Sequence, residues 1–257
     1  MQNGIILFTT IFAFAMPLGL LIFWKKRSNL TMFPFTVGGM CYLLFAMVLE
    51  QLVHMICIGM IQPLSDAILS NSWLYVIYGC VVAGLVEESG RYFGFRVLLR
   101  NYPEKETSVA YGIGHGGLET ILTLGLTYGV LFLTSRGIAS GDAEANAVLI
   151  DYINSLTVSE ACLTILERVA AMMMHIGLSI LVFTAVHQKQ QAYLFPIAIV
   201  LHGLAAAPLG MYQLELMPNL VLVEAIDFVF GACILAAGIM LYRKLPVTEK
   251  KEAKSEE

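Results

Sequence analysis

The 257-residue sequence has little charge: Asp, Glu, Lys and Arg together make up 13% of it. A soluble domain carries about 25% of such residues, so this chain lacks the charge that a soluble enzyme needs at its surface. The net charge of −4 leaves no basic patch for a phosphate backbone, which excludes a nucleic-acid partner. Hydrophobic residues instead make up 58% of the chain.

Cysteine is also sparse, and its spacing carries no motif. No C-x-x-C pair occurs, and an odd number of cysteines fits no disulfide framework. All of them lie in apolar runs, so we expect them to be buried small hydrophobic side chains. The five cysteines are Cys41, Cys57, Cys80, Cys162 and Cys233.

Long apolar runs are abundant. A membrane-spanning helix needs about 20 predominantly apolar residues. The sequence therefore predicts an all-α polytopic transmembrane bundle of seven spans in a single domain, residues 1–243, followed by a short charged tail at 244–257. The predicted spans are residues 4–24, 33–62, 72–99, 108–135, 156–186, 192–213 and 219–242.

The positions of Lys and Arg predict the orientation. Twelve of the 15 lie in connections on one side of the predicted membrane, and only Arg136 lies on the other. The remaining two, Arg91 and Arg168, lie inside spans. Because cytoplasmic connections carry the positive excess, we expect an outside N-terminus and a cytoplasmic C-terminus. The expected location is the lipid of a bacterial cell membrane, crossed several times.

Ionisable residues inside spans need an explanation, because each costs a few kcal/mol in lipid. A rise of about 1.5 Å per residue places one set roughly 10–18 Å from the positively charged end of the bundle. That inner set is Glu87, Glu88, Arg91, His115, Glu119, His175 and His202. A second set lies at roughly 22–31 Å and predicts a separate outer layer. For Glu167 and Arg168 we favour a structural ion pair in that layer, and the alternative is that the pair joins the network around His175. The outer set is Glu50, His54, Glu167, Arg168, Glu224 and Asp227.

The third predicted span carries two adjacent glutamates and an arginine. On a helix, Arg91 lies one turn after both Glu87 and Glu88, so it can pair with one of them. Two adjacent carboxylates in a low dielectric cannot both ionise cheaply. One ion-paired glutamate beside one basic glutamate is the arrangement that general-base catalysis needs. A buried ion pair that fixes helix packing explains only one of the two.

The fourth predicted span opens with the string G-I-G-H-G-G-L-E. Gly112 and Gly116 form a small-xxx-small pattern that predicts close helix packing. His115 and Glu119 share a helix face, which suits two metal ligands, a histidine oriented by a carboxylate, or a hydrogen bond that satisfies two buried groups. His175 and His202 stand alone on apolar turns, and their common depth favours a site over two isolated core histidines.

These motifs resemble those of known membrane proteases. E-E-x-x-R in one span, G-I-G-H-G-G-L-E in the next and single histidines in two later spans are similar to the CAAX prenyl endopeptidase superfamily and the PrsW proteases. They resemble most of all the YhfC-type intramembrane metalloproteases. The resemblance covers residues 72–210 and implies a glutamate-dependent protease with a peptide or membrane-protein substrate.

The resemblance also implies roles for the inner set. Glu87 would be the general base on water, Glu88 would pair with Arg91, and His115 would share the water, with Glu119 in the same catalytic set. His175 and His202 would stabilise the oxyanion or, together with His115, bind a zinc-like divalent metal. No H-E-x-x-H motif occurs, so an ordinary zincin mechanism is excluded.

Two positions depart from the CAAX-type pattern. Those enzymes space the arginine as E-E-x-x-x-R, whereas Arg91 comes one residue sooner. Their last histidine is followed four residues later by Asn or Asp, whereas Ser179 and Ala206 occupy those positions here. Prenylated CAAX substrates are therefore not implied.

Two other functions stay open. The chain could be a non-catalytic membrane scaffold of the same fold, similar to the scaffold subunit of gamma-secretase, although a scaffold has no use for the surplus glutamate. It could also be a proton- or metal-coupled transporter that uses the same Glu and His residues. The odd number of spans and the lack of a detectable repeat and of a helix pair broken by Pro or Gly argue against transport.

Overall fold

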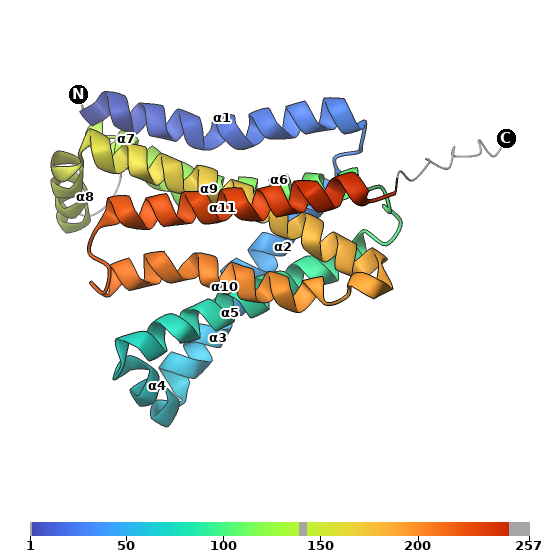
Figure 1. The fold of residues 1–257 in the computed structure, drawn as a ribbon. Coiled ribbons are helices and arrows are strands. Elements are labelled where there is room, and N and C mark those ends of the chain that lie inside the picture. The colour runs from blue at the N-terminus through green and yellow to red at the C-terminus, as the bar shows by residue number, and fades with distance from the viewer. Residues whose placement is uncertain (1, 139–142, 247–257) are drawn as a thin grey trace.

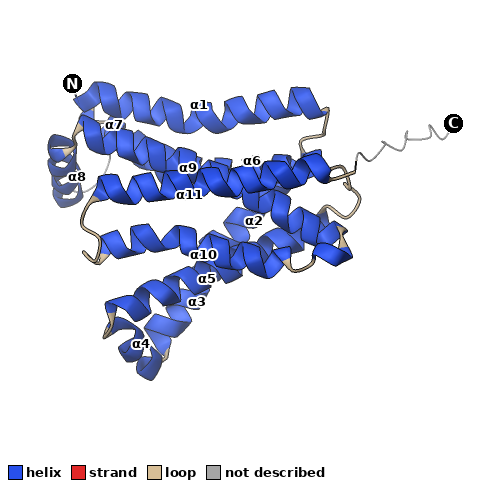
Figure 2. Cartoon of the chain, in the orientation of Figure 1, coloured by secondary structure: helices blue, strands red, loops and turns tan. Residues whose placement is uncertain are grey.

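The computed structural model describes residues 2–138 and 143–246, and all regular elements in those ranges are helices (Figure 2). Six helical stretches are long and apolar enough to cross a membrane, which confirms the predicted all-α polytopic bundle. They are Gln2–Ser28 (α1), Phe33–Met60, Glu106–Ser135, Val158–His187 (α9), Lys189–Gln213 and Leu220–Lys244 (α11). From residue 247 on, the predicted tail lies outside the described residues.

Several of these stretches contain more than one labelled helix (Figure 1). π-helical segments join the labelled helices of the second and third stretches, and a 3-10 turn, Lys189–Gln191, precedes the helix of the fifth. The second stretch holds α2 (Phe33–Cys41) and α3 (Gln51–His54), and the third holds α6 (Glu106–Thr120) and α7 (Leu126–Ser135). The fifth stretch holds α10 (Leu194–Gln213).

The third predicted span, residues 72–99, is one half of a bent helix pair. The pair consists of α4 (Gln62–Leu69) and Ser72–Leu98, whose main part is α5 (Ser72–Phe93), and the two meet at 115°. Asn71 restarts the helix, because its side chain accepts the backbone N–H groups of Trp73 and Leu74 at 2.9 and 3.1 Å. A broken helix pair is therefore present, but the two residues at the break, Ser70 and Asn71, are neither Pro nor Gly, so the pair is not of the Pro/Gly-broken kind that the sequence analysis considers. The break lies about 24 Å along the helix from Glu87, so it supplies no broken-helix site at the inner set.

The connection between the fourth and fifth predicted spans contains a helix that the sequence analysis does not predict, α8 (Ala143–Ser155). An acidic residue in its first turn, Glu144, favours a helix start there. The following helix, α9, begins with a capping box between Thr157 and Glu160. These signals end the long connection and fix where α9 enters the bundle.

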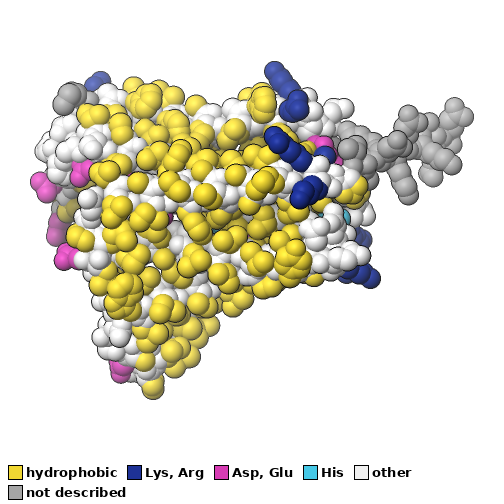
Figure 3. Space-filling model, in the orientation of Figure 1, with side chains coloured by type: hydrophobic (Ala, Val, Ile, Leu, Met, Phe, Trp, Pro, Cys, Tyr) yellow, Lys and Arg dark blue, Asp and Glu magenta, His cyan; other side chains and the backbone are white. Residues whose placement is uncertain are grey.

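The outer surface of the bundle is apolar, as lipid contact requires. Large side chains such as Phe8, Ile11 and Phe23 are more than half exposed (Figure 3). Of the five cysteines only Cys41 is buried, and Cys162 and Cys233 are exposed, so the expectation that all are buried is wrong. The reason is that an apolar side chain in a membrane protein can face lipid as well as the core.

Charged side chains gather at the two ends of the bundle. In Figure 3 the Lys and Arg side chains lie mainly at the end where α1 and α11 finish, and Asp and Glu lie mainly at the opposite end. This separation is the pattern on which the predicted orientation depends. Which end faces the cytoplasm stays a prediction.

Two glycines bring α5 and α10 together beside the inner set. A Cβ atom on Gly84 would lie 2.3 Å from the Ile199 carbonyl oxygen, and one on Gly203 would lie 2.6 Å from the Cys80 oxygen. Farther along, the helices separate toward α4 (Figure 1), and a Cβ on Gly79 would meet nothing within 4 Å. The crossing point therefore holds Glu87, one turn after Gly84, close to His202.

Candidate active site

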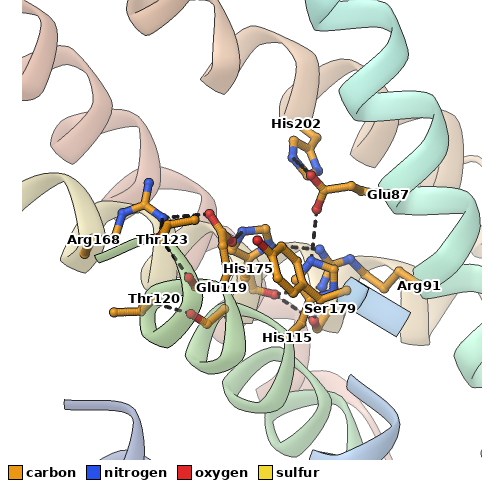
Figure 4. A network of polar contacts seen from close by, with 12 residues as sticks. Glu87, Arg91, His115, Glu119, Thr120, Thr123, Arg168, His175, Ser179 and His202 are labelled. Atoms are coloured by element: carbon orange, nitrogen blue, oxygen red, sulfur yellow. Dashed lines mark hydrogen bonds and ion pairs between the residues drawn. The ribbon is translucent and has the colours of Figure 1, made fainter. Parts of the chain in front are cut away.

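All seven residues of the inner set meet in one polar network between four helices (Figure 4). The helices are α5, α6, α9 and α10, so residues more than 110 positions apart in the sequence become neighbours. The structure therefore brings these residues together, and their common depth in the membrane stays a prediction. Their individual partners differ in part from those that the sequence favours.

Arg91 pairs with Glu88, as helix spacing predicts for one of the two glutamates. The Nε–H group of Arg91 donates to Glu88 Oε2 at 2.9 Å, and both side chains are fully buried. Arg91 also donates to Ser179 Oγ at 2.6 Å and to the His175 carbonyl oxygen at 3.3 Å. The guanidinium is therefore held from several sides.

Ser179 is a network residue that the sequence analysis mentions only as a departure from the CAAX-type pattern. It lies four residues after His175, where those enzymes carry Asn or Asp. In the structure its hydroxyl accepts from Arg91 and donates to the His175 carbonyl oxygen, both at 2.6 Å. The spacing from His175 was the available signal, because a polar residue one turn later lies on the same helix face.

Each of the three histidines has its own glutamate, but the pairs connect different helices. Glu119 contacts His175 rather than His115, so the same-helix interaction of His115 with Glu119 is not formed. The pairs are His115 Nε2 to Glu87 Oε2 at 2.9 Å, His175 Nε2 to Glu119 Oε2 at 2.6 Å, and His202 Nδ1 to Glu88 Oε1 at 2.7 Å.

The predicted packing face on α6 explains why His115 and His175 are close. A Cβ on Gly112 would lie 2.7 Å from the Ile176 Cα atom, and one on Gly116 would lie 3.2 Å from the His175 ring. Only glycine lets α6 approach α9 so closely here. The His115 and His175 ring centres are 4.6 Å apart as a result.

Arg168 belongs to the inner network and not to a separate outer layer. Its guanidinium donates to Glu119 Oε1 at 2.8 Å and to Thr123 Oγ1 at 3.1 Å, and it also pairs with Glu167. The expectation of a structural pair apart from the network is therefore wrong for Arg168 and Glu167. Depth counted along each helix misses this contact, because the long Arg168 and Glu119 side chains bridge the two layers.

A cavity of about 200 Å³, here called the central cavity, opens onto this network. Glu87, Glu119, Arg168, His175 and His202 line it together with small residues of α5, α9 and α10. Glu88 is fixed by Arg91 and Glu119 by Arg168. Among the described residues, Glu87 alone of these three glutamates has no arginine partner within 4 Å.

A second cavity of about 250 Å³, here called the wedge cavity, lies between the diverging parts of α5 and α10. It shares the lining residues Ala83, Ala206 and Leu209 with the central cavity. Its wall carries two residues of the predicted outer layer, Glu50 and His54, which lie 3.6 Å apart. His54 Nδ1 also lies 2.9 Å from the Tyr78 hydroxyl.

The network has the chemistry of a divalent-cation site. Glu87, His115 and His175 can each present one ligand atom within 4.8 Å of the others. Imidazole and carboxylate are the ligands that zinc uses at catalytic sites. Counting Glu87, Glu88, Glu119 and Glu167 against Arg91 and Arg168, four carboxylates and two guanidinium groups leave a formal charge of −2 with neutral histidines. The residues present therefore fit such an ion.

The helical bundle and its buried network define a multi-pass membrane protein with an intramembrane glutamate–histidine centre. Residues 12–227 match the family model described as YhfC intramembrane metalloprotease, and the chain belongs to this family. It is 33% identical over 230 residues to the uncharacterized membrane protein YhfC of Bacillus subtilis (strain 168), an alignment that covers 86% of this chain and 88% of that protein. No solved structure matches the chain. The predicted family is confirmed, and the relation to the PrsW and CAAX-type enzymes stays a prediction.

Proposed function

We propose that the chain is an intramembrane endopeptidase in which Glu87 activates the water that attacks a peptide bond. One observation carries this proposal: Glu87 lines the central cavity and has no arginine to neutralise it, whereas Glu88 and Glu119 are each held by one. A carboxylate that is buried, oriented and not ion-paired with arginine is suited to accept a proton. The intramembrane metalloprotease description of the family points to the same class of reaction.

The residues around Glu87 keep it in position for this step. His115 Nε2 contacts one carboxylate oxygen at 2.9 Å, and His202 Nε2 lies 3.7 Å from the other. Glu87 would take a proton from water while the water oxygen bonds to the carbonyl carbon. When the C–N bond breaks, the same proton would pass to the leaving nitrogen, so the peptide is cleaved and Glu87 is restored.

A divalent cation, when bound, would be held by Glu87 and the neighbouring histidines. It would supply Lewis-acid chemistry, which polarises a carbonyl oxygen and makes bound water more acidic. The protein itself contributes the fixed positions of these side chains. Arg91 and Arg168 hold Glu88 and Glu119 so that the surrounding charges do not move.

We infer that the peptide substrate approaches through the wedge cavity. The two cavities share Ala83 and Ala206, so a chain lying in the wedge cavity would reach Glu87 without crossing a packed helix contact. Together they hold little more than a few side chains, which favours an extended segment over a helix of about 10–12 Å diameter. The substrate would therefore be a peptide or membrane-protein segment that is unwound near the cleaved bond.

The two other functions receive less support. A scaffold has no evident use for a cavity that exposes an unneutralised glutamate. A transporter site built on a discontinuous helix would place the break at the binding residues, whereas the bend between α4 and α5 is about 24 Å along the helix from Glu87. The proton-accepting role of Glu87 is nevertheless common to protease and transporter, so the decisive measurement is peptide cleavage.

The experiment compares purified wild type with Glu87→Gln on a library of membrane peptides, with new peptide termini read by mass spectrometry. Loss of the base should lower cleavage at least about 10²-fold. Glu144→Gln is the matched control, because Glu144 is exposed on α8 and should leave cleavage unchanged. If neither wild type nor control cleaves any peptide, while proteoliposomes show a Glu87-dependent proton or metal flux, the protease proposal is wrong and transport is correct.

A further inference from the structure

The wedge cavity carries an acidic side chain that the proposed mechanism does not use. Glu50 is the last residue of the π-helical segment Tyr42–Glu50, and its side chain is only 14% exposed. One of its carboxyl oxygens, Oε1, lies 3.6 Å from His54 Nε2. The other, Oε2, is buried and has no hydrogen-bond partner. A buried oxygen without a donor is costly, so Glu50 needs an explanation.

The cavity wall holds no positive side chain that could neutralise Glu50. Among the described residues that line the wedge cavity, Glu50 is the only acidic one, and Lys and Arg are absent. His54 orients the carboxyl group, and its other ring nitrogen, Nδ1, lies 2.9 Å from the Tyr78 hydroxyl. The histidine ring is therefore held at both nitrogens. Glu50 is left as an oriented acceptor with one oxygen to spare.

A cationic side chain is the best partner for this acceptor. A carboxylate can only accept hydrogen bonds, and it accepts most strongly from a charged donor. The terminal torsion of a glutamate is broad, so a small rotation can turn the spare oxygen of Glu50 toward a ligand in the cavity. A basic residue is also costly in lipid. A substrate segment that carries one would therefore gain by placing it beside Glu50.

Helix spacing gives the position of that basic residue along the substrate. The wedge cavity extends along α5 from Tyr78, which contacts His54, to Ala83, which also lines the central cavity. These two residues precede Glu87 by about 14 and 6 Å along the helix. An extended chain covers about 3.3 Å per residue. A side chain at Glu50 would then belong to a residue about two to four positions from the cleaved bond.

We propose that Glu50 is a specificity-determining residue that selects peptides with Lys or Arg about two to four residues from the cleaved bond. The selected residue lies on the side of the bond that extends toward α4. His54 and Tyr78 position the Glu50 carboxyl group and do not contact the reacting atoms. This inference rests on the proposed function, because it takes the wedge cavity as the path of the substrate.

The first test measures peptide binding and does not depend on cleavage. Full-length protein carries Glu87→Gln so that the peptide is not consumed, and a fluorescent apolar membrane peptide is titrated in detergent. Two versions of the peptide differ at one position, which is arginine or citrulline, a residue of the same shape without the charge. The arginine version should bind at least about tenfold more tightly.

Substitutions of Glu50 should change this preference in opposite ways. Glu50→Gln, added to the same protein, should make the two peptides bind equally. Glu50→Lys should instead favour a peptide with glutamate at that position over one with glutamine. Asp66→Asn is the matched control and should keep the arginine preference, because Asp66 is an exposed carboxylate of α4 that is not among the described residues lining the wedge cavity.

Each variant is compared with its parent by size-exclusion chromatography and thermal unfolding, so that a lost preference is not mistaken for a lost fold. If Glu50→Lys misfolds, Glu50→Gln alone carries the comparison. Equal binding of the arginine and citrulline peptides by the folded protein with Glu50 intact, including no binding of either, overturns the inference. So does an arginine preference that Glu50→Gln leaves unchanged.

The second test reads the cleavage products of the peptide library. Wild type should enrich Lys and Arg about two to four residues from the new termini. Glu50→Gln should lose this enrichment and keep its kcat/KM on peptides without basic residues. Cleavage that depends on Glu87 but shows no enrichment overturns the inference and leaves the proposed function intact. Arginine-selective binding that requires Glu50, without any cleavage, supports the Glu50 site and contradicts the proposed function alone.

Discussion

The contact between α5 and α10 has a closely packed half and an open half, and both halves contain glycines. On the closed half, Gly84 and Gly203 let each helix touch the backbone of the other. On the open half, Gly79 and Gly210 meet nothing closer than 3.9 Å, and the wedge cavity lies between them. Small residues in membrane helices therefore allow close packing without causing it. The open half keeps its space because the helices diverge.

The largest effect should come from filling the closed half. Gly84→Leu places a side chain where even a Cβ atom would lie 2.3 Å from the Ile199 carbonyl oxygen, and backbone cannot shift cheaply. We expect destabilisation of about 3 kcal/mol, the upper end of the usual cost of overpacking, measured by thermal unfolding and by the yield of monodisperse protein. Wild-type stability in this variant would contradict the close contact.

Filling the open half should separate activity from stability. Gly79→Leu adds a similar volume where the structure has room, so we expect near-wild-type unfolding but at least about tenfold slower cleavage of library peptides. Val81→Leu is the control on the same helix, since Val81 is 56% exposed on the outer surface. Equal cleavage by both variants would mean that substrates do not use the wedge cavity.

Removing a polar group near the closed half should also lower the free energy of unfolding, but by less than Gly84→Leu does. Ser179→Ala removes an acceptor from fully buried Arg91 beneath the closed half. Because hydrogen bonds to charged groups contribute about 1.5–3 kcal/mol, the free energy of unfolding should fall by about 2 kcal/mol. Denaturant titration in detergent measures this change, and a difference below about 0.5 kcal/mol would mean that Arg91 is held without Ser179.

The smallest change in the free energy of unfolding is expected from a substitution in the wall of the wedge cavity. Tyr78→Phe deletes the hydroxyl that lies 2.9 Å from His54, but Tyr78 is only part-buried. A neutral hydrogen bond of this kind contributes about 0.5–1.5 kcal/mol, and partial exposure puts the effect at the low end. If Tyr78→Phe lowered the free energy of unfolding more than Ser179→Ala does in the same titration, the open half would contribute more to stability than the closed half.

The sequence predicts the spans and the members of the site, but not all of the contacts. Apolar runs locate the membrane helices to within a few residues, and helix spacing pairs Arg91 with one of the two glutamates. Spacing within one helix tells only which side chains share a face. The partner of Glu119 depends on how α6 and α9 are rotated and offset, and those are set by Gly112 and Gly116 packing against α9.

Two of the expectations from the sequence are wrong for the same physical reason. The exposed Cys162 and the Arg168–Glu119 contact both depend on which way a helix faces in the assembled bundle. A uniformly apolar helix in lipid carries little amphipathic pattern, because core and surroundings are alike in polarity. The rotation of α9 therefore cannot be read from hydrophobicity, whereas its existence can.

The burial of Arg91 has a consequence for how the protein is made. Helix α5 carries Glu87, Glu88 and Arg91, and each charge at mid-membrane opposes insertion by about 2.5–3.5 kcal/mol. The Glu88–Arg91 pair can form within α5 at once, but His202 is synthesised 114 residues after Glu88. At 5–20 residues per second that delay is roughly 6–23 seconds. The contacts of α5 therefore become available one after another during synthesis, since His115 follows Glu87 by 28 residues and His202 follows Glu88 by 114.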